Sequence, residues 1–197
     1  MTWVLASNNV GKLRELSALL QGWDIQPQGA FFNDEAEENG LSFIENALIK
    51  ARFAAAKTGL AAIADDSGLE VAALQGAPGI YSARYAGAQA TDAENNAALL
   101  HAMAHLVGEQ RQACYYCALV AVRHAHDPTP MIGLGRWCGH ILTAPRGEGG
   151  FGYDPLMYFD DLQASAAELD PALKNQRSHR AQALRALVAQ LQGEWPR

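Results

Sequence analysis

The stretch "LASNNVGKLRELSALL", residues 5–20, passes from an apolar run through a short polar turn into a helical pattern. Leucines recur at positions 13, 16, 19 and 20, which predicts one apolar stripe along a helix. A strand that turns into a helix through small polar residues presents free backbone N–H groups at the helix start. These groups, with Lys12 beside them, suit a phosphate, although an ordinary capped turn has the same layout.

The turn does not follow the Walker A pattern, because Lys12 precedes a leucine and the fifth residue before Gly11 is an alanine. It keeps the physical properties of a phosphate loop all the same. Asn8 and Asn9 tolerate left-handed backbone, and Gly11 allows an anion to approach closely. Because a cation at a helix start opposes the helix dipole, we expect an anion near Lys12.

Predicted helices and strands alternate along the rest of the chain. Capping boxes predict helices after Ser42 and Thr91, and Gly59 is a natural stop for the first of these. The stretch "LAAIADDSG", residues 60–68, predicts a short strand that ends at two aspartates, and residues 69–74 predict another strand. No linker or repeat divides the chain, so we expect one α/β domain over residues 1–197 with a long central sheet.

The composition is that of an ordinary globular protein, with 49% hydrophobic residues, 18% charged residues and a net charge of −6. This acidic balance argues against binding to nucleic acid or to an anionic membrane, because both need a basic face. We find no signal peptide and no long apolar span, so we expect the protein in the cytoplasm.

Three cysteines, at positions 114, 117 and 138, form an odd set. Cys114 and Cys117 have C-x-x-C spacing, but they lie within the apolar run "ACYYCALVAV" and no second pair completes a zinc site. Buried, reduced thiols in a strand are therefore expected rather than a redox or metal site.

Two adjacent carboxylates, Asp65 and Asp66, repel each other unless cations or hydrogen-bond donors offset their charge. Neighbouring side chains on a strand point to opposite sides, so only one of the two should face a given cleft. An Asx-turn with Ser67 is the structural alternative. A carboxylate at a strand end beside a phosphate loop is a typical Mg²⁺ ligand, and the acidic stretch 34–38 is either a solvated loop or the source of a second one.

Two late segments carry further candidates. In "GGFGYDP", Phe151 stands among glycines, where backbone flexibility and a flat ring meet, and it is either a core residue or a platform for a base. In "KNQRSHR", four basic residues precede or begin the last helix, which is predicted to start at Ser178. Cations are poorly placed at a helix start for stability alone, which favours an anionic or carbonyl-bearing ligand.

Six motifs occur in one order along the chain: Ser7-x-Asn9-x-x-Lys12, Phe43-x-Glu45-Asn46-Ala47, Asp65-Asp66-Ser67-Gly68, Gly76-Ala77-Pro78-Gly79, Phe151-Gly152-Tyr153-Asp154-Pro155 and Ser178-His179-Arg180. In this order they resemble the inosine triphosphate pyrophosphatase family, and more narrowly the bacterial dITP/XTP pyrophosphatases. The resemblance runs from about Val4 to the last helix.

The resemblance implies Mg²⁺-dependent hydrolysis of non-canonical purine nucleoside triphosphates (ITP, dITP, XTP) to the monophosphate and pyrophosphate. It also implies a homodimer and a two-lobed α/β fold, in which helices flank a long mixed sheet and the active cleft lies between the lobes. Asp66 is implied as proton acceptor and metal ligand, Lys12 as a second catalytic residue, and Glu37 as the other metal ligand. Glu38 leaves that register open by one residue. The implied substrate-binding residues are Ser7, Asn8, Asn9, Val10, Gly11, Lys12, Ser67, Phe151, Gly152, Tyr153, Asp154, Lys174, His179 and Arg180.

Selection of the base needs a donor near its 6-carbonyl, such as Arg180, and an acceptor near N1–H. The Asp154 carboxylate or a backbone carbonyl could be that acceptor. A Maf-like nucleotide pyrophosphatase is one alternative, although its S-x-S-x-x-R opening differs here at Asn9 and Lys12. A nucleotide sensor without turnover is the other, and it would have no need of carboxylates beside the phosphate-binding residues.

Overall fold

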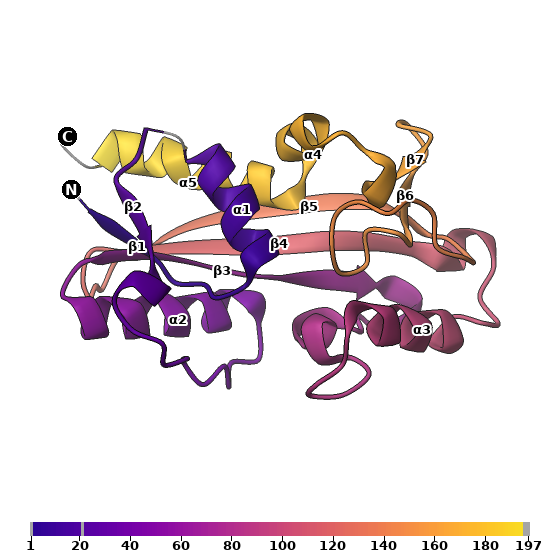
Figure 1. Ribbon diagram of the computed structural model, residues 1–197, viewed down its shortest axis with the longest axis horizontal. Coiled ribbons are helices and arrows are strands. Elements are labelled where there is room, and N and C mark those ends of the chain that lie inside the picture. The colour runs from indigo at the N-terminus through magenta and orange to yellow at the C-terminus, as the bar shows by residue number, and fades with distance from the viewer. Residues whose placement is uncertain (1, 21, 195–197) are drawn as a thin grey trace. The chain divides into compact units, whose positions relative to one another are not determined.

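The computed structural model describes residues 2–20 and 22–194, and it has the α/β architecture expected from the sequence (Figure 1). Seven strands form one mixed sheet in the order β2-β1-β3-β4-β5-β6-β7. The strands are β1 (Trp3–Leu5), β2 (Ile25–Pro27), β3 (Ala61–Val71), β4 (Gln112–Val122), β5 (Met131–Ile141), β6 (Met157–Phe159) and β7 (Ala164–Ser165). The α-helices are α1 (Val10–Leu19), α2 (Phe43–Thr58), α3 (Asp92–Ala102), α4 (Pro171–Arg177) and α5 (His179–Glu194).

The residues group into two compact units. Unit 1 comprises Met1–Ser67, Cys117–Gly135 and Ser178–Arg197, and unit 2 comprises Gly68–Tyr116 and Arg136–Arg177. Strands β3, β4 and β5 each contribute residues to both units.

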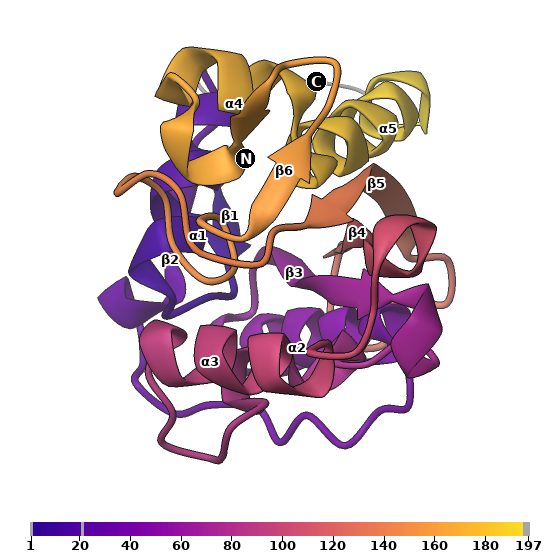
Figure 2. The ribbon, with the colours of Figure 1, turned by 90° about the vertical axis from the view of Figure 1, so that its right-hand side faces the viewer.

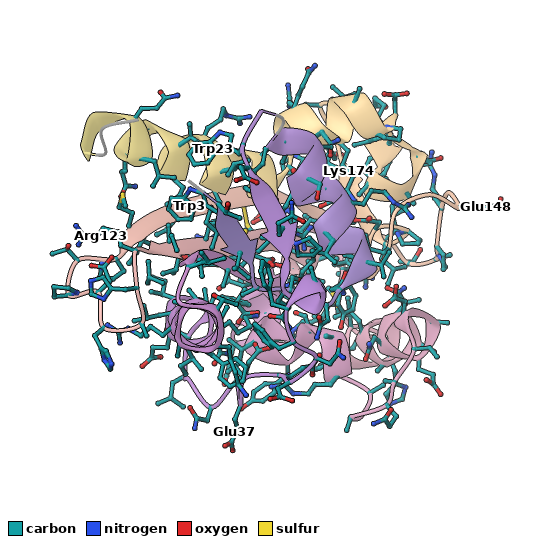
Figure 3. All side chains as sticks on the ribbon, turned by 60° about the vertical axis from the view of Figure 1, so that its left-hand side comes forward. Trp3, Trp23, Glu37, Arg123, Glu148 and Lys174 are labelled. Carbon is teal, nitrogen blue, oxygen red and sulfur yellow. A yellow bond between two sulfur atoms is a disulfide. The ribbon has the colours of Figure 1, made fainter. Side chains whose placement is uncertain are left out.

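In unit 1, strand β1 pairs in parallel with β2 and with β3. Helix α2 covers one face of these strands, and helices α1 and α5 pack together on the other (Figure 1). Buried side chains of the strands and of α1 and α5, among them Leu16, Ile63 and Leu187, form the core of this unit. Trp3 and Trp23 meet edge to face, with ring centroids 6.1 Å apart (Figure 3). This contact packs the segment after α1 against strand β1.

Two glycines in β5 let helix α5 lie very close to the sheet. A Cβ on Gly135 would stand 1.9 Å from the carbonyl oxygen of His179, and one on Gly133 would stand 2.1 Å from that of Ala183. Real Cβ atoms do not approach backbone oxygens so closely, so this strand needs glycine at both positions. The contact fixes the first turn of α5 and, with it, Arg180.

In unit 2, strands β5, β6 and β7 pair antiparallel, and helix α3 lies on the opposite side of the strands from α4 (Figure 2). The core includes a stacked pair, Trp137 and Phe159, with ring centroids 3.7 Å apart. Arg111 is only 8% exposed, and its guanidinium donates hydrogen bonds to backbone carbonyls of Met103, Leu106, Ile141 and Leu142. These bonds tie the segment after α3 to the end of β5.

The sequence-based boundaries are correct at the caps and wrong within one strand. Ser42 and Thr91 cap α2 and α3, and Gly59 ends α2 with a φ of 70°. Strand β3, however, runs without a break from Ala61 to Val71, so the predicted strand end at the aspartates is wrong. Side-chain charge does not stop a strand when the charges are matched, and ion pairs match both carboxylates here.

The last helix begins within one residue of its predicted start at Ser178. Helix α5 begins at His179, after a short separate helix that carries Lys174 and Arg177. The Oγ of Ser178 accepts a hydrogen bond from the N–H of Ala181 at 3.2 Å. Only two of the four basic residues, His179 and Arg180, therefore lie at the start of the last helix.

The cysteine prediction holds for one residue of the C-x-x-C pair. Cys117 is buried and free, and burial raises the pKa of its thiol far above its usual value. Cys114 is bonded to Cys138 in a disulfide, so the expectation of reduced thiols is wrong for Cys114 and Cys138. Neighbouring strands bring facing residues within about 4.5–5.5 Å, which sequence spacing alone does not reveal.

Candidate functional site

The predicted site residues form two groups, one in each unit. The carboxylate cluster of unit 1 comprises Lys12, Lys50, Asp65, Asp66, Ser67 and Arg180. The aromatic loop of unit 2 comprises residues 151–154, with Lys174 beside it.

The opening turn forms the start of helix α1. Asn9 is the N-cap residue, and its Oδ1 accepts a hydrogen bond from the N–H of Lys12 at 3.0 Å. Its φ is −75°, so this asparagine does not adopt the left-handed backbone that it can tolerate. Asn8 is exposed, and its Nδ2 donates to Glu35 Oε1 at 3.0 Å. Because the first N–H groups of a helix have no preceding carbonyl, those of Val10 and Gly11 are the donors available to an anion.

An anion, the Asp65 carboxylate, lies next to Lys12, as the position of this lysine at a helix start predicts. Its Nζ lies 3.0 Å from Asp65 Oδ2, and the Asp65 side chain is only 1% exposed. The Ser67 hydroxyl donates to the same oxygen at 3.3 Å, and Arg180 Nε lies 3.6 Å from it. Burial would raise the pKa of Asp65, but Lys12, Arg180 and Lys50 outweigh it, so this pKa lies well below its usual value. Asp65 is thus an ionised, buried anchor for two cations.

Arg180 is held by unit 1 itself. Its guanidinium donates to Glu15 Oε2 at 2.6 Å and to Ser67 Oγ at 2.9 Å, and the residue is 4% exposed. Burial would lower the pKa of Arg180, but the Glu15 and Asp65 carboxylates raise it above its usual value. His179, the residue before it, is also buried at 4% exposure. A contact of either residue with a purine base stays a prediction.

Asp66 points toward helix α2, which covers the other face of strand β3. The alternation of side chains along a strand predicts this. Lys50 Nζ lies 3.5 Å from Asp66 Oδ1, which also accepts the N–H of Ser67 at 3.0 Å. Burial raises the pKa of Asp66 despite the attraction of Lys50 and Lys12. Its second oxygen, Oδ2, is buried and accepts no hydrogen bond from the residues that the structure describes.

The two candidate glutamates of the acidic loop are placed differently. Glu38 Oε2 lies 3.2 Å from Lys50 Nζ, so the same ammonium group joins Glu38 and Asp66. Glu37 is exposed, and its side chain points outward from the loop (Figure 3). The local geometry therefore favours Glu38 over Glu37 as the second carboxylate near Asp66.

The Asp66 and Glu38 carboxylates suit a hard divalent cation that takes most of its ligands from outside the protein. Across residues 2–20 and 22–194, no three His, Cys, Asp or Glu side chains group closely enough to hold a metal ion alone. Mg²⁺ takes one or two protein carboxylates and completes its shell with water and phosphate oxygens. The buried Asp66 Oδ2, which lacks a protein donor, fits one such position.

The aromatic loop of unit 2 is firmly anchored, contrary to the flexibility expected from its glycines. The N–H of Gly152 donates to Asp92 Oδ2 at 2.7 Å, and its carbonyl accepts from Asn96 Nδ2 at 2.9 Å. The hydroxyl of Tyr153 donates to the Ser82 carbonyl at 2.7 Å. The Phe151 ring is half-buried, and the ammonium of Lys174 lies 5.0 Å from its centroid.

Asp154 organises this loop. Its Oδ2 accepts from Lys174 Nζ at 2.6 Å and from the N–H of Phe151 at 2.9 Å, and its Oδ1 accepts from the Tyr115 hydroxyl at 2.9 Å. A Cβ on Gly150 would stand 2.1 Å from Asp154 Oδ2, and the φ of Gly150 is 73°, so glycine is required there. Three donors thus hold this carboxylate in place.

Sequence reasoning missed three partners of these residues: Glu15, Lys50 and Tyr115. Lys50 had a local signal, because it follows Asn46 by four residues and so shares a helix face with another polar side chain. Glu15 and Tyr115 meet partners 165 and 39 residues away in the chain, and no local pattern reports such contacts.

Curated proteins with similar sequences cover nearly the whole chain. A dITP/XTP pyrophosphatase of Thioalkalivibrio sulfidiphilus is 57% identical over 195 residues, which is 98% of this chain and 100% of that protein. A dITP/XTP pyrophosphatase of Burkholderia pseudomallei is 58% identical over 193 residues, or 95% of this chain and 92% of that protein.

Solved structures agree with the sequence comparison. A HAM1 protein from Coxiella burnetii superimposes with a TM-score of 0.90 at 48% identity, covering 98% of this chain and 99% of that one. The Ham1 protein of Staphylococcus aureus gives 0.88 at 37% identity, covering 99% and 100%. The model of the Ham1 family matches residues 3–190. With the sequence and the fold in agreement over nearly its full length, this chain belongs to the Ham1 family.

Proposed function

We infer that this protein hydrolyses non-canonical purine nucleoside triphosphates (ITP, dITP, XTP) to the nucleoside monophosphate and pyrophosphate. Relatives more than 50% identical over nearly the whole chain are dITP/XTP pyrophosphatases. The observation that carries the chemistry is the carboxylate cluster: a buried aspartate with an unsatisfied oxygen lies beside Lys50, next to a helix start that suits phosphate.

The two aspartates have different chemical roles in this proposal. Asp66, buried beside Lys50, is the proposed acceptor of the water proton. Asp65 has a lowered pKa and stays ionised, so it holds Lys12 and Arg180 in place. Lys12 and the N–H groups at the start of α1 stabilise negative charge on the phosphates.

We propose Mg²⁺ as the cofactor, with Asp66 and one glutamate of the acidic loop as its protein ligands. A bound Mg²⁺ would withdraw charge from the phosphate oxygens and increase the electrophilicity of the phosphorus. The Oδ2 of Asp66 accepts no hydrogen bond from the described residues, which supports this assignment. Glu38 is favoured over Glu37, because Lys50 already contacts both Glu38 and Asp66.

The aromatic loop is suited to a purine base. Phe151 offers one half-buried ring face, and stacking on an aromatic ring contributes about 1–3 kcal/mol per base. Because the Asp154 carboxylate already accepts three hydrogen bonds, we propose that it positions Lys174 and Phe151. Reading of N1–H would then fall to a backbone carbonyl.

Three expectations remain: two come from the resemblance and one, the location, comes from the sequence itself. The homodimer, the cleft between two lobes of one domain and the cytoplasmic location stay predictions. No helix in the described part of the chain is both long enough and apolar enough to span a membrane.

The test is pyrophosphate release from ITP, XTP, dATP and dGTP at micromolar concentration with Mg²⁺. We expect fast release from ITP and XTP alone and its loss in Asp66→Asn, while the control Glu109→Gln, at an exposed residue outside both groups of site residues, keeps the wild-type rate. Equal rates on dATP and dGTP, or orthophosphate as the product, would refute the proposal. Tight ITP binding without turnover would indicate a sensor instead.

A further inference from the structure

A large cavity in unit 2 contains the Cys114–Cys138 disulfide in its wall. The cavity has a volume of about 990 Å³, and its lining includes both cysteines together with Arg111, Arg136, His140 and Glu109. Cys138 is exposed and Cys114 is half-buried. The sulfur–sulfur bond is therefore accessible to a small molecule, unlike a disulfide sealed in a core.

The charged groups around this bond are mixed, and two basic residues, Arg136 and His140, flank Cys138 on its strand. On β5, residues 136, 138 and 140 share one face of the strand, about 7 Å apart in succession, and all three line the cavity. Arg136 pairs with Glu70 at 2.8 Å but keeps a side chain that is 60% exposed. His140 pairs with Asp160 at 3.3 Å. The exposed guanidinium is placed to attract an anionic nucleophile to Cys138.

We propose that Cys114 and Cys138 form a reversible thiol–disulfide exchange site for a low-molecular-weight anionic thiol. The thiolate of that molecule attacks Cys138 Sγ, a new S–S bond forms there, and the Cys114 sulfur leaves as a thiolate and takes a proton. A second molecule of the same thiol then displaces the Cys138 thiolate. One external disulfide and two protein thiols result, so two electrons pass from the external thiol to the protein.

The sheet makes this exchange reversible. Strands β4 and β5 are hydrogen-bonded neighbours, so the backbone keeps the two sulfurs close together whether or not they are bonded. Attack at Cys138 is favoured over attack at Cys114, because Cys138 is the more exposed of the two. Cys117 takes no part, since it is fully buried and its raised pKa keeps the thiol protonated.

The experiment uses the full chain in native buffer, treated with reduced glutathione and quenched with an alkylating agent before peptide mass spectrometry. We expect alkylation of Cys114 and Cys138 to rise together with glutathione concentration and to reverse with oxidised glutathione, while Cys117 reacts only after denaturation. In oxidised glutathione, Cys114→Ser should form the mixed disulfide at Cys138 faster than Cys138→Ser forms one at Cys114.

Arg136→Gln tests the steering. Removing the charge that lies two residues from Cys138 on the same strand face should slow the reaction with glutathione about threefold at low salt and much less at high salt. A disulfide that resists glutathione until the chain unfolds would overturn the proposal, as would two thiols that stay reduced in oxidised glutathione. No readout here uses nucleotide hydrolysis, so the result is independent of the proposed function.

Discussion

Removal of a single hydroxyl tests how the aromatic loop is held. The Tyr115 hydroxyl donates to Asp154 Oδ1 at 2.9 Å, and the two residues are 6% and 3% exposed. Tyr115→Phe keeps the ring and deletes only the hydroxyl. One oxygen of the buried Asp154 carboxylate therefore loses its hydrogen-bond donor. A hydrogen bond to a charged group contributes about 1.5–3 kcal/mol, so we expect a loss of stability of about 2 kcal/mol.

Thermal unfolding measures this loss. For a chain of this length, about 2 kcal/mol corresponds to a decrease in Tm of roughly 4–8 °C. Tyr81→Phe is the matched control, because it removes a hydroxyl from a residue that is 55% exposed, and its Tm should stay within about 1 °C of wild type.

The same variant has a kinetic consequence that rests on the proposed function. Asp154 also holds Lys174 and the N–H of Phe151, so loosening the carboxylate should raise the KM for ITP more than it lowers kcat. Equal Tm values for Tyr115→Phe and Tyr81→Phe would refute the reasoning, since they would show that Asp154 does not depend on the Tyr115 hydroxyl.

Three further changes have definite expectations. Glu38→Gln should raise the Mg²⁺ concentration needed for half-maximal activity at least tenfold, whereas Glu37→Gln should leave it near wild type, and the opposite order would return the ligand to Glu37. Gly135→Ala should cost about 1–3 kcal/mol in urea unfolding, because its Cβ would meet a backbone oxygen of α5 at 1.9 Å, and an unchanged midpoint would contradict the close packing. The side chain of Arg123 is the main reason why the pKa of Asp127 lies below its usual value, so the stability from Asp127 is present above about pH 4 and is lost on further acidification. Urea midpoints between pH 6 and 3 should therefore fall more steeply in wild type than in Asp127→Asn. If the two midpoints fell in parallel with pH, the ionised Asp127 would not contribute to stability as argued.

Local patterns predicted the elements whose signals lie within a few residues. The capping residues Ser42, Thr91 and Gly59 fix helix ends through contacts with their own helix, so the sequence shows them directly. The predicted strand-to-helix transition in the opening turn was likewise confirmed, because α1 starts at Val10. What it did not show was how Asn9 would act, because an asparagine can cap a helix or adopt left-handed backbone with the same neighbours.

The remaining features depend on contacts between distant segments. Strand β3 continues through its two aspartates only because Lys12 and Lys50 arrive from two different helices. The disulfide likewise requires β4 and β5 to be neighbours, which the spacing of Cys114 and Cys138 in the chain does not state. Family motifs named the candidate site residues, whose roles stay predictions, whereas the identity of their contact partners required the fold.

The adjacent aspartates show how one strand can hold two acids with opposite properties. Because β3 alternates, Asp65 meets Lys12 and Arg180 on the side of α1 and α5, while Asp66 meets Lys50 on the side of α2. Lys12, Arg180 and Lys50 together outweigh burial at Asp65, whereas burial outweighs the cations at Asp66. The environments thus push the two pKa values apart, which is how proteins assign different roles to paired carboxylates. If this assignment holds, Asp65→Asn should weaken stability and displace Lys12, whereas Asp66→Asn should abolish turnover in a chain that still folds.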